Sequence, residues 1–215
     1  VAHMLSYRDK LQLEIDRRRY EQNKEMVKDL PTFSDLRLYL RGLYKNDDLS
    51  FIINYLLIEL NVRNKDCDCE IVENMRQTHA NDKENYLVIQ DTGVWYIRNN
   101  YKTFKIYGTK KIKITSKKFL HSVKSFYETQ REELGDEVPI YLMAKSSGER
   151  IGEDSIQKFI VSRTLDGLTE GDINKISVSR VDKIGDLSKL KKISKNRGTS
   201  VENLIEYYNL NMSLN

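Results

Sequence analysis

The sequence contains few histidines, and this scarcity excludes two common kinds of catalytic site. Only 3 histidines occur among 215 residues. His3 belongs to the stretch at residues 1–4, which we interpret as a cloning scar ahead of a natural start at Met4. Because His79 and His121 alone remain, neither a histidine-based metal site nor a Ser-His-Asp triad is supported.

Cysteine and long hydrophobic runs are also scarce. Cys67 and Cys69 are separated by one residue and have no second pair, so they indicate neither a disulfide framework nor a zinc site, and we predict free thiols. No apolar stretch has the length of a membrane span, and no secretory signal precedes the first expected helix. These absences predict a soluble, intracellular protein without a membrane partner.

The charged residues are numerous but unevenly distributed. Charged residues make up 32% of the chain and hydrophobic residues 39%, which is typical of a globular protein, and the net charge is only +4. One segment, 102–118, contains seven lysines and no acidic residue, and a second basic run covers 189–197. Each run is either a solvated surface or a face that binds phosphate, and the composition alone does not decide between them.

The chain is predicted to form one large domain behind a charged lead-in. Residues 5–30 are the lead-in, with an exposed helix over 7–29, and residues 31–215 form the domain. Apolar residues at helical spacing, preceded by capping residues, predict further helices. These helices cover 33–45, 47–60, 116–134 and 153–165, the last capped at Asp154 or Ser155, and short helices in 176–210 separated at Gly185 and Gly198.

Between these helices the periodicity changes to that of strands. Residues 85–114 contain β-branched and aromatic runs interrupted by Asp-Thr-Gly and Tyr-Gly-Thr, which predicts a meander of three antiparallel strands. Residues 139–143 form a short extended piece. The expected fold class is therefore α+β, mainly α, with a small three-stranded antiparallel sheet.

Five polar residues stand out within this outline. Arg63 follows the buried helix, Lys102 lies in the sheet region, Arg180 follows a serine-rich stretch, and Tyr207 and Tyr208 lie in the last helix. Each also has an ordinary structural explanation. An arginine after a helix commonly neutralises the C-terminal carbonyls, a strand lysine faces water, and late tyrosines pack in the core.

Taken in order, these residues resemble the catalytic domain of the tyrosine recombinase (phage-type integrase) superfamily over about residues 31–211. Arg63, with Asp66 three residues later, matches the first arginine of that family and its trailing acid. Lys102, within Lys-Thr before a basic strand, matches the hairpin lysine, and Ser177 to Arg180 matches the His-x-x-Arg box. Among subfamilies, the integrase-like proteins of large DNA viruses and virophages are the most similar.

The nucleophile follows from the last box of the family. Gly198-Thr199-Ser200 matches its Gly-His-Ser box, in which the tyrosine comes nine residues after the histidine. Since 208 − 199 = 9, the spacing selects Tyr208 over Tyr207. The resemblance implies DNA cleavage and rejoining through a 3′-phosphotyrosyl intermediate, in site-specific recombination or integration. It implies no metal, no other cofactor and no small-molecule substrate.

The resemblance also assigns roles. Arg63 and Arg180 would neutralise the phosphate, Tyr208 would attack it, and Lys102 would protonate the leaving 5′-hydroxyl. The expected partner is double-stranded DNA, with a homo-oligomer on that DNA. The basic residues expected to contact phosphates are Lys105, Lys110, Lys111, Lys195 and Arg197.

Two positions depart from the family pattern. Ser177 and Thr199 stand where the family has histidines, and neither can accept a proton at neutral pH. Acid–base assistance of this kind accounts for about 10²–10⁴ in rate. His121, which we expect on a helix surface, has no spacing that marks it as a replacement. The alternatives are therefore a DNA-binding protein that kept the fold without efficient chemistry, or a helical interaction protein.

Overall fold

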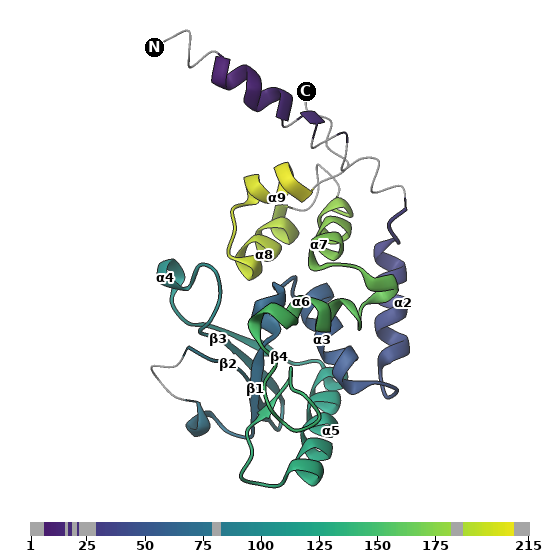
Figure 1. Cartoon of the computed structure of the whole chain (residues 1–215), viewed down its shortest axis with the longest axis vertical. Coiled ribbons are helices and arrows are strands. Elements are labelled where there is room, and N and C mark those ends of the chain that lie inside the picture. The colour runs from purple at the N-terminus through teal and green to yellow at the C-terminus, as the bar shows by residue number, and fades with distance from the viewer. Residues whose placement is uncertain are drawn as a thin grey trace.

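The computed structural model describes residues 7–15, 17, 18, 21, 29–78, 83–181 and 187–208, and residues 1–4 and Gly185 lie outside this range. The fold is α+β and mainly helical, as predicted (Figure 1). In the lead-in, residues 7–15, 17, 18 and 21 are helical, whereas residues 29 and 30 form a turn. The helices that follow are α2 (Phe33–Leu43), α3 (Asp48–Glu59), α4 (Phe104–Tyr107), α5 (Lys117–Leu134), α6 (Glu153–Val161), α7 (Glu170–Ser179), α8 (Leu187–Arg197) and α9 (Val201–Tyr208). Three short 3₁₀ helices are η1 (Asn64–Cys67), η2 (Met75–Gln77) and η3 (Leu165–Gly167).

The first two helices of the domain begin at the caps that the sequence predicts. Thr32 accepts from the backbone N–H of Asp35, whose carboxylate bonds back to Thr32, and this capping box starts α2. Asp47 caps α3, which is buried on nearly every side. Leu36 and Leu40 of α2 are buried, whereas Leu38 is 66% exposed.

The sheet has five strands, so the prediction of three is wrong. The strands are β1 (Cys69–Val72), β2 (Asn85–Gln90), β3 (Gly93–Arg98), β4 (Lys110–Ile114) and β5 (Ile140–Tyr141), in the order β4-β3-β2-β1-β5. The predicted antiparallel meander corresponds to β2, β3 and β4. β1 pairs in parallel with β2 and antiparallel with β5. Both added strands are short and pair with distant segments, so no local turn signal marks them.

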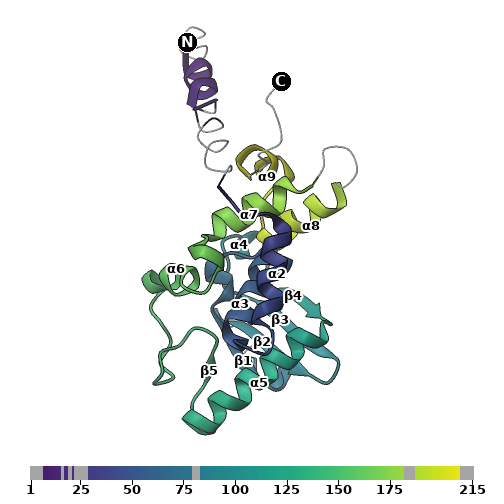
Figure 2. The same ribbon diagram turned by 90° about the vertical axis from the view of Figure 1, so that its right-hand side faces the viewer.

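Helices cover one face of the sheet and place most of the apolar residues there. Figures 1 and 2 show α5 lying along the strands, with α3 and α2 beside it. The core formed there includes Leu57 of α3, Leu87 of β2 and Phe119 of α5, each at most 1% exposed. A smaller cluster around Tyr86 and Val88 covers the opposite face.

The C-terminal helices differ from the sequence prediction in where they begin. α7 begins at Glu170, ahead of the predicted 176, because Thr169 and Asp172 form a capping box. α6 has Gly152 at its N-cap, and not Asp154 or Ser155. The end of α7 packs with α8 and α9 around a separate cluster that we call the C-terminal cluster, formed by Val178, Val181, Leu190, Ile193 and Leu204.

Candidate functional site

Arg63 lies in the turn between α3 and the sheet, and a buried ion pair fixes this turn. The backbone N–H of Arg63 donates to Asp66 Oδ2 at 3.3 Å, and Arg98 Nη1 donates to the same oxygen at 2.8 Å. The side chains of Arg98 and Asp66 are 0% and 1% exposed. Burial raises the pKa of Asp66, while the Arg98 charge opposes that rise. The turn that presents Arg63 is thus anchored to β3.

Arg98 also connects this turn to the end of α8. Its Nη1 donates to the carbonyl oxygen of Asn196 at 2.7 Å, and the rings of Tyr96 and Tyr101 lie 5.5 and 5.2 Å from its guanidinium carbon. Sequence analysis missed this residue. The available signal was that Arg98 ends an otherwise apolar strand. A charge there needs a buried partner such as Asp66.

A pocket of about 460 Å³ opens at the Arg63 turn. Arg63 and Lys102 both line it, together with Glu170 at the start of α7. The Nε of Arg63 is buried and has no hydrogen-bond partner in the part of the chain that the structure describes. Arg63 and Lys102, which the sequence singled out separately, therefore face one cavity.

Glu170 is a second contact between the Arg63 turn and α8. One carboxylate oxygen accepts from the backbone N–H of Asn64 at 2.8 Å, and the other accepts from Arg197 Nη2 at 2.5 Å. The Arg197 side chain is 4% exposed and that of Glu170 19%. Arg197, which the sequence predicted as a DNA contact, is therefore covered by this carboxylate in the structure, and its contact with DNA stays a prediction.

The β3–β4 connection lies against the segment that begins at Gly198, because Thr103 and Lys110 are the nearest residues to Gly198. Gly198 has φ +65°, and a Cβ there would lie 2.2 Å from Thr103 Oγ1, so both conformation and space require glycine. Lys110 Nζ donates to the carbonyl oxygen of Lys195 at 2.7 Å. Burial, with the Arg98 charge second, lowers the pKa of Lys110 to about 8.

The structure does not bring Ser177 and Arg180 to the Arg63 pocket. Arg180 follows the C-terminal end of α7, where its guanidinium carbon lies 3.5 Å from the centre of the Phe33 ring. The 10 residues of α7 separate it from Glu170 by about 15 Å along the helix axis. Ser177 is 0% exposed. Their match to a His-x-x-Arg box at the site is thus not supported by their positions.

The other predicted residues fall into three groups. Lys105, Lys111 and the side chain of Lys195 are exposed near the β3–β4 connection. Thr199 is partly exposed and lines a second pocket of about 440 Å³ with Lys110. Tyr208 ends α9, but the side chains of Tyr207 and Tyr208 lie outside the described part of the structure, so their directions remain a prediction.

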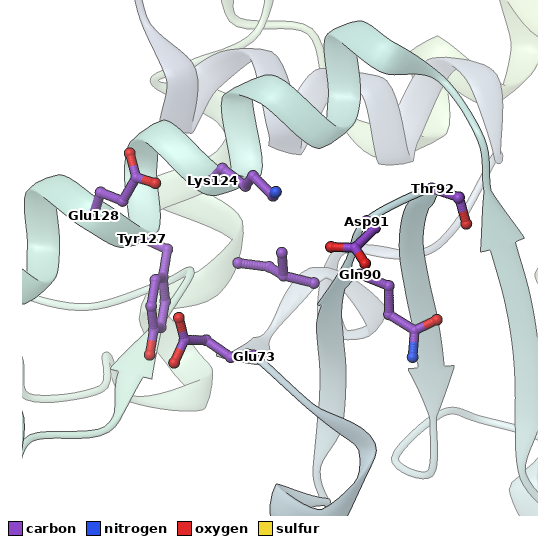
Figure 3. A pocket seen from close by; sticks show the side chains of 8 residues that line it. Glu73, Gln90, Asp91, Thr92, Lys124, Tyr127 and Glu128 are labelled. Atoms are coloured by element: carbon purple, nitrogen blue, oxygen red, sulfur yellow. The ribbon is translucent and has the colours of Figure 1, made fainter.

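A larger pocket, of about 630 Å³, lies away from these residues. It opens between α5 and the β2–β3 turn, and Figure 3 shows Lys124 on α5 pointing across it toward the strands. Glu73, Asp91 and Glu128 also line it, and these carboxylates repel phosphate. Its size does not make it the better candidate, because its charge does not suit DNA.

Cys67 and Cys69 are free and buried, as predicted, and burial raises the pKa of each thiol well above its ordinary value. Within the described residues, no group of three or more His, Cys, Asp or Glu side chains is arranged to hold a metal ion. Among the described helices, none combines the length and the apolar character needed to cross a bilayer. His121 lies on the exposed side of α5.

Comparisons with known proteins identify the fold. No family model matches the sequence, and no curated protein matches it significantly. A search of solved structures finds the crystal structure of XerA recombinase, with a TM-score of 0.51 and 14% sequence identity. The match covers 85% of this chain and 62% of the XerA chain, so this chain spans less than two thirds of that protein. The chain therefore shares its fold with XerA recombinase.

Proposed function

We propose that the protein cleaves and rejoins DNA strands through a 3′-phosphotyrosyl intermediate. The observation that carries this proposal is that Arg63 and Lys102 line one pocket in a chain with the fold of XerA recombinase. Gly198 and Thr199 adjoin the same β3–β4 connection that bears Lys102. Tyr208, nine residues after Thr199, is the proposed nucleophile.

Besides the tyrosine nucleophile, the proposed chemistry needs charge stabilisation at the phosphate and a proton donor for the leaving group. Arg63 would neutralise the non-bridging oxygens as charge develops on the phosphate, because a guanidinium is permanently charged and bidentate. Tyr208 would lose its hydroxyl proton to water and form a bond to the phosphorus, the bond from phosphorus to the 5′-oxygen would break, and Lys102 would donate a proton to that oxygen as it leaves.

The partner in this proposal is double-stranded DNA, bound by the exposed lysines of the β3–β4 connection. A homo-oligomer on DNA and a relationship to viral integrases belong to the same proposal. The similarity to XerA at 14% identity supports the fold, and these finer points need their own tests.

A covalent adduct is the direct test. A duplex nicked near the cleavage point releases a short fragment on attack, so the protein should remain bound in a species that resists SDS. Tyr208→Phe removes one oxygen and keeps the ring, and it should abolish the adduct while leaving DNA binding near wild type. Tyr207→Phe should leave the adduct intact, because adjacent helical residues point about 100° apart.

The alternative, a DNA-binding protein without chemistry, is favoured by the position of Arg180 over Phe33 and by Thr199 in place of histidine. It predicts salt-dependent DNA binding with no adduct from wild type or either tyrosine variant. An adduct that persists in Tyr208→Phe and disappears in Tyr207→Phe would instead shift the assignment by one residue.

A further inference from the structure

The carboxylate of Glu170 occupies a position that is built to hold an anion. A backbone N–H from Asn64 and a guanidinium from Arg197 converge on its two oxygens, at 2.8 and 2.5 Å. Backbone amides together with arginine are a donor set typical of phosphate sites in proteins. Asn64 belongs to the Arg63 turn and Arg197 ends α8, so the two donors come from separate parts of the chain.

Glu170 also separates Arg197 from the pocket that contains Arg63 and Lys102. Glu170 lines that pocket, whereas Arg197 behind it is 4% exposed. Both oxygens of the carboxylate are engaged by Asn64 and Arg197, and the buried Nε of Arg63 has no partner within the described residues. A phosphate group has more oxygens than a carboxylate, so it can satisfy the same two donors and still reach Arg63.

We propose that the Asn64 amide and Arg197 form a phosphate-binding cradle, which Glu170 fills in the free protein and from which a DNA phosphate displaces it. Arg197 then supplies the second guanidinium of the site, the role that the sequence assigned to Arg180. The DNA part of this inference rests on the proposed function, but the cradle itself can be tested with inorganic phosphate.

Glu153 offers a matched control for Glu170. Each is the first residue of a helix, and each pairs with the Arg63 turn, since Glu153 bonds Lys65 Nζ at 2.8 Å. Glu153 is 72% exposed, however, and does not line the Arg63 pocket. Replacing either glutamate changes the net charge equally, so a difference between the variants reports on the position of the carboxylate.

The first experiment measures thermal unfolding in sodium phosphate and in sodium chloride of equal ionic strength. Phosphate should raise the Tm of Glu170→Ala by about 3 °C more than that of wild type or Glu153→Ala, because it binds the vacated cradle only in the folded state. The double variant Glu170→Ala/Arg197→Met should lose this additional shift. Equal shifts in Glu170→Ala and Glu153→Ala, or an additional shift that survives in the double variant, would overturn the proposal.

Replacing Glu170 by alanine removes a carboxylate partner of the buried Arg197. Glu170→Ala is therefore expected to be less stable than wild type. If Glu170→Ala does not unfold cooperatively, the phosphate-dependent Tm shift is compared between Glu170→Gln and Glu153→Gln instead, since the amide keeps the shape of the carboxylate. A phosphate shift with no difference between those two variants would count against the cradle.

The second experiment measures affinity for a labelled DNA duplex at fixed salt. Glu170→Gln should bind about tenfold more tightly than Glu153→Gln, because the phosphate no longer competes with an internal anion. Tighter binding confined to Glu170→Gln supports the displacement, and equal binding by the two variants overturns it. If no form of the protein binds DNA while phosphate still stabilises Glu170→Ala, the cradle is supported and only the proposed function fails.

Discussion

Two of the hydrophobic clusters in the described chain, the main core and the C-terminal cluster, differ in size and in what they hold together. The main core extends from Leu36 of α2 to Ile176 of α7 and joins the sheet to the helices that cover it. The C-terminal cluster has five buried residues, from Val178 to Leu204, and supports the helices on either side of Thr199. Hydrophobic burial thus accounts for the position of Arg63 far better than for that of the C-terminal helices.

Polar contacts connect the C-terminal helices to the part of the protein that contains the main core, and three of them end on the last turn of α8. The carbonyl oxygens of Lys195 and Asn196 accept from Lys110 and Arg98, and Arg197 bonds Glu170. Cations at the C-terminal end of a helix are favourable, because the last carbonyls are unpaired and partly negative. Apolar packing therefore determines the fold, whereas buried charges determine how the candidate nucleophile helix is placed against the Arg63 pocket.

Substitution of Arg98 is expected to have the largest effect on stability, because Arg98 joins the two regions. Arg98→Met leaves Asp66 buried without its ion-pair partner and should lower the free energy of unfolding by about 3–5 kcal/mol. Arg150→Met is the control, because its pair with Asp68 is 26% and 12% exposed, and it should cost less. Urea denaturation measures both. Equal losses in the two variants would show that burial of the Arg98 pair does not matter.

Two leucine-to-alanine variants distinguish the contribution of the main core from that of the C-terminal cluster. Leu57→Ala in α3 removes a side chain that is 1% exposed from the main core and should cost about 3–5 kcal/mol of global stability. Leu204→Ala in α9 removes a side chain that is 0% exposed from the C-terminal cluster and should cost about 2 kcal/mol. Amide hydrogen exchange should rise throughout the chain in the first variant and mainly in α8 and α9 in the second. A uniform rise in Leu204→Ala would mean that the two clusters unfold as one unit.

The same division explains how much the sequence predicted. Helices α2, α3 and α5 and the meander β2–β4 were predictable, because capping residues, apolar periodicity and turns are local signals. The extended piece predicted at 139–143 contains β5, but β1 and the pairing of these two strands were not predictable, since that pairing joins segments far apart in the chain. The Thr169–Asp172 capping box was a usable signal for the start of α7. Using it would have placed Arg180 at the far end of that helix.

At the candidate site, the sequence identified the cations that line the pocket better than those buried behind it. Arg63 and Lys102 could be paired through an order of motifs, and they line one pocket. Arg98 and Glu170 could not be found that way, because their importance comes from partners 98 and 27 residues away. Tertiary contacts, and not local pattern, select which charges are buried and paired.

Lys110 tests one of the polar bridges through pH. Its pKa is lowered to about 8 from an ordinary 10.5, so the unfolded chain holds this proton more tightly than the folded protein. The contribution of Lys110 to stability therefore rises as pH increases from about 8 to 10.5, and it is lost again as pH falls through about 8. Wild type should gain about 1 kcal/mol relative to Lys110→Met across that range, once solvent screening is allowed for.

Urea denaturation at several pH values between 7 and 10.5 measures this gain, and Lys111→Met is its control. Lys111 is exposed on the adjacent position of β4, so its difference from wild type should not change with pH. A constant difference for Lys110→Met as well would show that the amine is not desolvated by its contact with α8.

The smallest expected effect tests whether DNA is bound by the face that carries the β3–β4 connection or by the acidic pocket beside α5. Lys111 is exposed beside the β3–β4 connection, whereas Lys124 lines the acidic pocket with Glu73, Asp91 and Glu128. Each substitution by alanine removes one positive charge. If Lys111 contacts a phosphate, Lys111→Ala should reduce the slope of log affinity against log salt by about one and weaken binding about threefold. Lys124→Ala should change neither quantity, because neighbouring carboxylates keep phosphates away from it. Fluorescence anisotropy with a labelled duplex between 50 and 200 mM salt measures both slopes, within the range where counterion release dominates. Equal slopes for the two variants would mean that net charge alone governs binding, and the assignment of the DNA-binding face to the β3–β4 connection would then be wrong.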